Sequence, residues 1–309
     1  MPFDPTQAPV VFGEALFDCF QDGPPGADEQ GEETQVLGGA PFNVAWHLAA
    51  FGAGPTFVSR VGDDALGSRI EAAMREQNIT TAGLQRDPVH PTGKVQVTLA
   101  AGEPTYEIVA GSAYDYIDAG ALPDLPQDAL LYHGTLALRN AASAAALEAL
   151  RGHTNAIFLD VNLRAPWWSL EQVRTLLDGA HWVKLNADEL ELLAAHGDSP
   201  EARAASLIER HGLARVYGTL GAQGAFALDA DGSIARVHPG ASVEVVDAVG
   251  AGDGFASVLI LALLRGWPLA ATLARAQDFA SAIVGRRGAT IHDPAFYAGF
   301  ARQWAGREG

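Results

Sequence analysis

The sequence is poor in cysteine and in basic residues, and it has no long apolar run. Its one cysteine, Cys19, has no second cysteine with which to form a disulfide, and the first residues, 1–4, lack the basic and apolar stretches of a signal peptide. Both features favour a reducing cytoplasm. The 20 Lys and Arg residues against 37 Asp and Glu residues leave a formal charge of −17, which would repel a phosphate backbone. The longest apolar run, 255–264, is shorter than the ~20 residues of a bilayer span. We therefore expect binding neither to nucleic acid nor to a membrane.

The composition is that of a folded α/β protein. Apolar residues make up 48% of the 309 residues and charged residues 18%, which excludes disorder as the main state. The 34 glycines cluster in short runs between apolar segments, as in a chain with many tight turns. Short strand-like runs rich in branched residues alternate with longer Ala/Leu-rich helical patterns. This alternation predicts a mostly parallel sheet flanked by helices. The expected strands are 10–12, 56–58, 130–132, 157–159, 182–185 and 215–217.

Two stretches depart from this rhythm and predict a small antiparallel sheet. Residues 94–101 alternate between apolar and polar, and the pattern resumes at 105–109 after the connection Gly102-Glu103-Pro104. The polar segment Asp22–Glu33 would be the turn of a second ribbon between 17–20 and 34–37. Together the ribbons would form a flap over the main sheet. We expect a single unit, 1–309, with an α/β core at about 1–12, 40–90 and 115–309 and a β lid at about 13–39 and 91–114.

The most informative window is 243–255, where an apolar strand is expected to enter the turn Gly250-Ala251-Gly252 before an apolar helix. Helix N-termini present unpaired N–H groups, and glycine lets the backbone approach an anion closely. A phosphoryl group suits this place. Asp253 would then accept the proton of a hydroxyl that attacks the phosphoryl group. The alternative is that Asp253 only caps the helix.

A second window, 37–52, places a glycine pair before an apolar helix. The backbone of Gly38 and Gly39 and the amide of Asn43 could meet a polyhydroxylated ligand, and Asp18 is a further acceptor for sugar hydroxyls. An ordinary loop and helix start is the alternative.

In a third window, Asn186 and Glu189 could position a hydrated Mg²⁺, although Asn and Glu at this spacing also resemble a capping box. The two interpretations are compatible.

Two more strand ends fit a ligand rich in phosphate. Asp160, Asn162 and Arg164 follow an apolar strand, and Arg164 could clamp a phosphate. The turn 218–224 is rich in glycine and carries the Thr219 hydroxyl. Turn chemistry and a surface salt bridge explain both stretches equally well.

Sequence fingerprints of other chemistries are absent: the sequence has no zinc-site, nucleophile-elbow, P-loop or dinucleotide-binding motif. Cys19 is expected to be a small buried residue.

The order of these motifs resembles the ribokinase or PfkB family of carbohydrate kinases, from Val10 to about Thr290. The stretches most similar to bacterial fructokinases are 13–18, 38–45, 160–164 and 183–186, and Ala40-Pro41 stands where ribokinases usually have a lysine after the glycine pair. The resemblance implies a ribokinase-like three-layer α/β/α fold with a β lid, ATP as phosphoryl donor with Mg²⁺, and a sugar, most like fructose, as acceptor.

The resemblance also implies roles for individual residues. Asp253 would be the base, with Gly250, Ala251 and Gly252 as the anion hole, and Asn186 and Glu189 would be linked to magnesium through water. The sugar would meet Asp18, Gly38, Gly39 and Asn43. Arg164, near the nucleotide, is counted with the substrate-binding residues. The nucleotide would meet Asn186, Thr219, Gly221, Gly224 and Gly252.

The family also implies a potassium site and leaves alternatives open. K⁺ would be held by Asp247, the Val249 carbonyl and a loop near 287–289. The chain departs from the family at Ala248, usually Thr, and at Gly254, commonly Ala or Ser. One alternative is a 2-keto-3-deoxygluconate kinase or another PfkB sugar or nucleoside kinase. The acid substrate would need a cation, for which Arg139, Arg164 and Lys94 are candidates. A non-catalytic sugar or nucleotide sensor is the third hypothesis. A homodimer through the lid is also expected.

Overall fold

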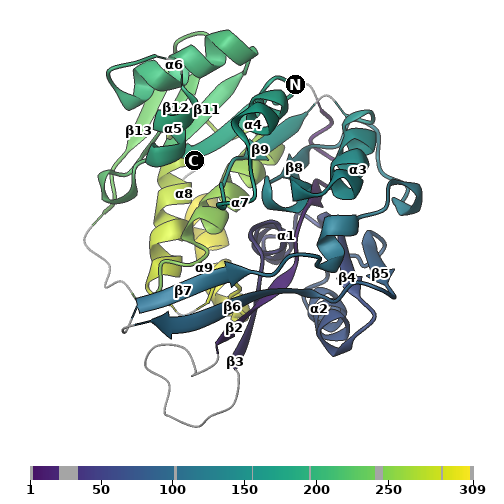
Figure 1. Cartoon of the computed structure of the whole chain (residues 1–309). Helices are drawn as coiled ribbons and strands as arrows, with labels where there is room; N and C mark the ends of the chain where they lie inside the picture. Colours follow the sequence, from purple (N-terminus) through teal and green to yellow (C-terminus); the bar gives the residue numbers. More distant parts are fainter. Residues whose placement is uncertain are drawn as a thin grey trace.

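The computed structural model describes residues 3–20, 34–100, 103–154, 156–194, 196–240, 246–286 and 288–306. Within them, a nine-stranded central sheet has the order β13-β12-β11-β10-β9-β8-β1-β4-β5 (Figure 1). Neighbouring strands are parallel except at β11–β12 and β12–β13. The mostly parallel sheet is thus confirmed, with all six expected strands. In sheet order the strands are β13 (Ile234–Val237), β12 (Ala225–Asp229), β11 (Arg215–Thr219), β10 (Trp182–Asn186), β9 (Ile157–Asp160), β8 (Leu131–His133), β1 (Val10–Phe12), β4 (Thr56–Gly62) and β5 (Leu84–Asp87).

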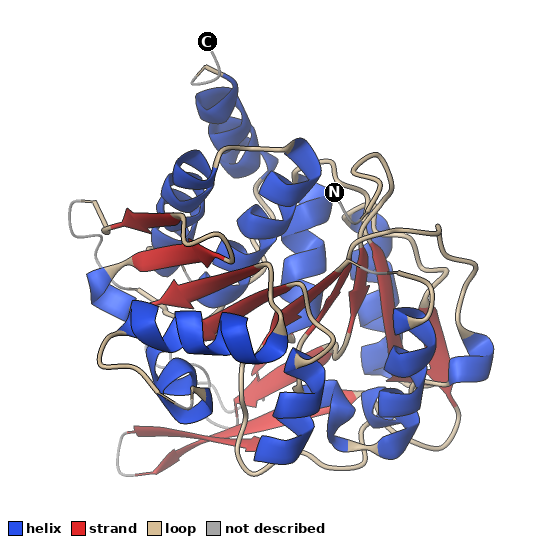
Figure 2. Ribbon diagram, turned by 90° about the horizontal axis from the view of Figure 1, so that it is seen from above, coloured by secondary structure: helices blue, strands red, loops and turns tan. Residues whose placement is uncertain are grey.

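Helices cover both faces of this sheet (Figure 2). Side chains alternate between the two faces, so Val11 packs in one core and Val10 and Phe12 pack in the other. The three-layer α/β/α architecture is therefore confirmed. One face carries α1 (Ala40–Ala50), α2 (Ala65–Glu76), α7 (Ala251–Arg265), α8 (Leu269–Val284) and α9 (Pro294–Ala305). The other carries α3 (Ala141–Arg151), α4 (Leu170–Leu177), α5 (Ala187–Leu193) and α6 (Pro200–His211). None of the described helices is long and apolar enough to cross a membrane.

The strand order reverses between β1 and β8. From β1 the chain proceeds to β4 and β5 on one side, and from β8 it proceeds to β9, β10 and β11 on the other. The two strands are parallel and in register, with Phe12 opposite His133. Ligands of open α/β sheets bind beyond the carboxyl ends of the strands at such a reversal, because the connections diverge there and leave a crevice. The segments that follow β1 and β8 are therefore placed to form a site.

A separate four-stranded sheet has the order β3-β2-β6-β7 and lies beside the core, at the bottom of Figure 1. Its strands are β2 (Leu16–Phe20), β3 (Thr34–Gly38), β6 (Gly93–Ala100) and β7 (Glu103–Ile108). Both expected ribbons are antiparallel, and β2 pairs with β6 in parallel. We call it the small sheet.

One boundary of the small sheet differs from the prediction. Glu103 and Pro104 were expected in a connection, but they begin β7. Pro104 is compatible with β7 because β7 is an edge strand of the described sheet, and edge strands are where sheets accommodate proline. The expected turn 22–33 lies outside the described residues.

Four short 3₁₀ helices complete the described structure: η1 (Ala113–Tyr116), η2 (Ala119–Ala121), η3 (Leu136–Arg139) and η4 (Gly221–Gln223).

Candidate active site

The N-terminus of α7 has the geometry of an anion site. Its N-cap is Gly250, whose φ of 80° suits glycine, and a Cβ there would lie 2.3 Å from the Ala289 Cβ. Within the described residues no side chain caps this end, so first-turn N–H groups are available to an anion. Asp253 lies in the first turn rather than at the cap, so the interpretation of Asp253 as an N-cap is wrong. The strand expected at 243–246 falls largely outside the described residues.

Asp253 is joined to the second motif by a side-chain hydrogen bond. The Asn43 Nδ2 donates to Asp253 Oδ2 at 2.8 Å, so residues from the two glycine motifs meet where α1 packs on α7. Burial raises the pKa of Asp253 to about 6, and the Asp160 carboxylate adds to this, while Asn43, Lys184 and Arg164 oppose it. A carboxyl with this pKa is mostly ionised at pH 7 and still basic enough to take a proton.

The predicted sugar-contacting residues gather around Gly38. A Cβ at Gly38 would lie 3.7 Å from Asp18 Oδ2 and 3.9 Å from Asn43 Oδ1, so the glycine leaves room between two polar groups. Burial raises the pKa of Asp18 to about 6, with a further contribution from Asp247. Gly39 has a φ of 107°, and its missing Cβ would meet the Glu14 carbonyl oxygen at 2.7 Å. The structure thus brings Asp18, Gly38 and Asn43 together.

A buried ion pair lies beneath the glycine turn. Lys184 Nζ donates to both carboxylate oxygens of Asp160, at 2.8 and 3.0 Å, and the Tyr132 hydroxyl donates to the same carboxylate at 3.2 Å. Burial would lower the pKa of Lys184, but the Asp160 carboxylate outweighs it and the net shift is upward. A Cβ at Gly252 would lie 3.7 Å from Lys184 Nζ. Sequence reasoning missed Lys184, although a lysine inside an apolar strand was a usable signal.

Asn186 and Glu189 form the capping box of α5. The Asn186 side chain accepts from Glu189 N at 2.9 Å, and Glu189 Oε2 accepts from Asn186 N at 2.9 Å. Glu189 Oε1 also accepts from Leu163 N at 2.7 Å. Because both carboxylate oxygens already hold backbone N–H groups, only their remaining lone pairs could reach a metal ion. The described residues contain no group of three or more His, Cys, Asp or Glu side chains fit to hold a metal. A hydrated Mg²⁺ fits this arrangement, since it keeps several waters.

The other expected nucleotide-contacting residues are near the same edge. Thr219 stands opposite Asn186 in the β10–β11 register, and its hydroxyl donates to the Leu185 carbonyl at 3.4 Å. Gly224 is explained by the backbone alone, because its φ is 93° and a Cβ would lie 2.0 Å from the Val237 carbonyl oxygen. Gly221 is exposed in the same turn. Arg164 is exposed and donates to the Leu163 carbonyl.

Asp247 ties the turn before α7 to the segment after α8. Its Oδ1 accepts from Val249 N at 2.9 Å and its Oδ2 accepts from Gly288 N at 3.1 Å. The N–H groups of Val246 and Asp247 both donate to the Val284 carbonyl. Arg287 lies outside the described residues. The two segments expected to hold K⁺ are therefore neighbours, as such a site requires.

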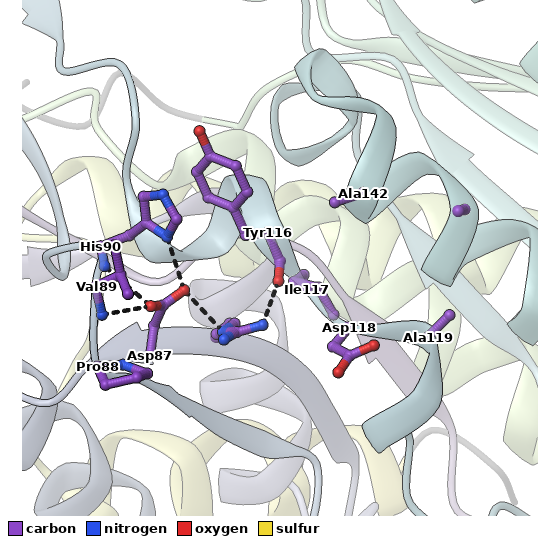
Figure 3. Close-up of a pocket in the computed structure, with 11 residues that line it drawn as sticks. Asp87, Pro88, Val89, His90, Tyr116, Ile117, Asp118, Ala119 and Ala142 are labelled. Carbon is purple, nitrogen blue, oxygen red and sulfur yellow. Dashed lines mark hydrogen bonds and ion pairs between the residues drawn. The ribbon is translucent and has the colours of Figure 1, made fainter.

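A cavity of about 450 Å³ is lined by the end of β5 and the link that follows it, by residues 116–119 and by α3, and none of the predicted site residues lines it (Figure 3). Asp87 accepts hydrogen bonds from Val89 N and His90 N and forms an ion pair with Arg60 at 2.9 Å. The His90 ring stacks on Tyr116, with centroids 3.6 Å apart. His90 precedes β6 and Tyr116 follows β7, so these contacts fix the two connections of the small sheet to each other.

Comparison with known proteins identifies the family of this site. The model of the pfkB family carbohydrate kinases matches residues 7–295. The chain belongs to this family and is a carbohydrate kinase. It is 29% identical over 298 residues to a fructokinase of Klebsiella pneumoniae, covering 90% of this chain and 94% of that protein.

Solved structures agree on the fold of the kinase. A fructokinase from Xylella fastidiosa with bound ATP superposes with a TM-score of 0.81 at 22% identity, covering 96% of this chain and 98% of that one. A doubly substituted fructokinase from Vibrio cholerae O395, with fructose, ADP and potassium ion bound, gives a TM-score of 0.78 at 25% identity, covering 94% and 98%. The ribokinase-like fold expected from the motifs is confirmed.

Proposed function

We propose that the kinase is an ATP-dependent fructokinase, with Asp253 as general base and the Gly250-Ala251-Gly252 turn as anion hole. The observation that carries this proposal is the 2.8 Å hydrogen bond between Asn43 and Asp253, which places the acceptor-side motif against a helix N-terminus fit for a phosphoryl group. The fructokinases among the relatives support fructose as the acceptor.

The reaction follows from the chemistry of the residues. The acceptor hydroxyl loses its proton to Asp253 as its oxygen bonds to the γ-phosphorus, and the bond from that phosphorus to the bridging oxygen breaks, leaving ADP. First-turn N–H groups of α7 stabilise the negative charge on the transferring group. Asn43 orients Asp253 through its hydrogen bond. The small sheet would act as a lid that keeps water from the γ-phosphoryl group.

The remaining assignments place the nucleotide at the ends of β10 and β11. Asn186, Thr219, Gly221, Gly224 and Gly252 would face ATP, and Gly38 and Gly39 with Asp18 and Asn43 would face the sugar. Asn186 and Glu189 would hold Mg²⁺ through water, and the ion would neutralise charge at the phosphates. Arg164 is exposed and can approach a phosphate group.

A substrate panel tests the proposal directly. We expect ADP release with Mg-ATP to be clearly faster on D-fructose than on ribose, glucose, 2-keto-3-deoxygluconate or nucleosides. Preference for another sugar would refute fructose as the acceptor but would still show that the protein is a sugar kinase. Tight sugar binding by calorimetry with no turnover on any acceptor would instead indicate a sensor.

The acid-substrate alternative finds less support in the geometry. Arg139, one candidate partner for a carboxylate, is already held by both oxygens of Asp115 at 2.6 and 2.9 Å. It also donates to the Tyr114 hydroxyl and the Val109 carbonyl. A guanidinium neutralised in this way attracts a second carboxylate weakly. A neutral sugar therefore fits better than 2-keto-3-deoxygluconate.

We expect potassium to activate the kinase through Asp247 and the Val249 carbonyl, because the paired segments 246–249 and 288–289 are adjacent. The rate with 100 mM K⁺ should exceed the rate with 100 mM Na⁺ several-fold. Asp247→Asn should reduce the difference, since it removes the negative charge of the Asp247 carboxylate. Equal rates in both salts would exclude the site.

Two further assignments accompany the proposal. The open edge of β7, with Tyr106 54% exposed, would let two small sheets pair in a homodimer. The proposed location is the cytoplasm, where ATP is at hand.

A further inference from the structure

Glu14 lies at the reversal of strand order, in the link between β1 and β2. It follows β1 by two residues, so it emerges at the carboxyl edge of the sheet beside the end of β8. Its side chain is only 4% exposed. The link is sterically fixed, because a Cβ at Gly13 would lie 2.4 Å from Pro41 Cγ. Glu14 is therefore held by the backbone at a place where ligands of such sheets bind.

The carboxyl of Glu14 has an unused acceptor. Its Oε2 atom is buried and has no hydrogen-bond partner among the described residues. Leaving a buried acceptor unpaired costs free energy, so this carboxylate oxygen calls for a partner such as water, an ion or a ligand, and its position at the strand reversal favours a ligand. Burial raises the pKa of Glu14 to about 7, and the Asp253 carboxylate adds to the shift, while Arg164 and Arg139 oppose it. The charge of Glu14 thus acts on the candidate base itself.

A buried donor near Glu14 is also unused. Arg139 follows β8 and its side chain is 5% exposed, yet its Nη1 atom has no partner among the described residues. Glu14 and Arg139 interact electrostatically, and both interact with the Tyr114 side chain. The Trp167 ring lies 4.4 Å from the Arg139 guanidinium carbon. An unused acceptor and an unused donor, backed by aromatic rings, suit an uncharged ligand with several hydroxyls.

We propose that Glu14 is a sugar-binding residue of the kinase, whose Oε2 accepts a hydrogen bond from a hydroxyl other than the one that is phosphorylated. The inference rests on the proposed function, because it assigns a specificity residue to the sugar site. Asp253 accepts the proton of the reacting hydroxyl. Glu14 binds a second hydroxyl of the sugar, and Arg139 Nη1 is the accompanying donor. A site built to bind a hydroxyl rejects analogues that lack it.

The test compares Glu14→Met, which removes the acceptor at similar length, with Glu14→Gln, which keeps an acceptor oxygen. At about pH 8, where a carboxyl with a pKa of about 7 is mostly ionised, Glu14→Met should raise the KM for D-fructose about 10- to 100-fold, as expected for losing a hydrogen bond to a charged group. Glu14→Gln should raise it less. The KM for ATP and the melting temperature should stay close to the wild type. Glu148→Met, at an exposed glutamate of α3, should match the wild type in all three.

Deoxyfructoses identify the hydroxyl. One monodeoxyfructose that lacks a non-reacting hydroxyl should be a poor substrate for the wild type, and on that analogue Glu14→Met should add no further loss. If the variant loses the same factor on every analogue, or if the KM for ATP rises instead, Glu14 does not bind the sugar.

A failure of the fructose assignment is distinguishable from a failure of this inference. If the wild type prefers another sugar of the panel, the comparison is made on that sugar, and an unchanged KM in Glu14→Met overturns the role of Glu14. If no sugar is turned over, calorimetry compares the binding of D-fructose to the wild type and to Glu14→Met, and weaker binding to the variant would support the role of Glu14. Binding that is equal in the wild type and Glu14→Met, or absent from both, also overturns it.

Discussion

Asp253→Asn should lower kcat by about 10²- to 10⁴-fold, the usual contribution of a general base, while ATP binding stays measurable. The amide has the shape of the carboxylate but cannot take the hydroxyl proton. Glu171→Gln is a matched control, because Glu171 is an exposed acid in the first turn of another helix, α4, and this variant should keep full activity. A variant at position 253 that retained more than about a tenth of the wild-type rate would refute Asp253 as the base.

The pH profile separates Asp253 from its acidic neighbours. Protonated Asp253 cannot act as a base, so wild-type kcat/KM should fall about tenfold per unit as the pH drops below about 6, where burial places its pKa. The pKa of Asp18 is also raised to about 6. The residual rate of Asp253→Asn has no base to protonate and should lose this dependence. An equally steep decline in that variant would assign the titration to Asp18 or to Glu14, whose pKa is raised to about 7.

Lys184→Met should destabilise the kinase by about 3–5 kcal/mol, because it leaves the Asp160 carboxylate buried without a compensating charge. Urea unfolding followed by fluorescence measures this. The rate should fall as well, since Lys184 Nζ lies beneath Gly252 and stabilises the ionised form of Asp253.

The double variant Asp160→Asn/Lys184→Met should be more stable than Lys184→Met alone, because it no longer contains an unpaired buried charge. Arg236→Met is the control at a surface pair. The Arg236 and Glu201 side chains are 51% and 26% exposed, so its loss should cost only about 0–1 kcal/mol. A cost for Lys184→Met no larger than that of the control would show that water compensates Asp160.

The three layers and most strands of the main sheet could be predicted from the sequence, because parallel strands that are buried on both faces appear as short apolar runs. Three strands escaped it. The segment of β5, Leu84–Asp87, has one uncharged polar residue and two charged residues, and it is a strand only because β4 pairs with it. The β12 and β13 strands extend the sheet as an antiparallel edge, which the βαβ rhythm does not indicate.

A candidate site could be proposed from the sequence where one short window carries the chemistry, as at 250–253. It could not be proposed where the arrangement depends on residues distant in sequence. Nothing local indicates that Asn43 bonds to Asp253 across 210 positions, or that Asp160 finds Lys184. Glu14 stood inside a recognised motif, but its unpaired oxygen is a property of the packed structure.

The small sheet has a consequence for the order of folding. Its central pairing joins β2 with β6, strands that are separated in sequence by β3 and by the core elements α1, β4, α2 and β5. Closing so long a loop costs chain entropy before the contacts between β2 and β6 can offset that cost. The small sheet should therefore form after these core elements. By the same reasoning its amides should exchange with solvent through local opening, well before those of β1 or β8. The part of the kinase that we propose as a lid over the substrate would thus be its least stable unit, able to open while the core remains folded.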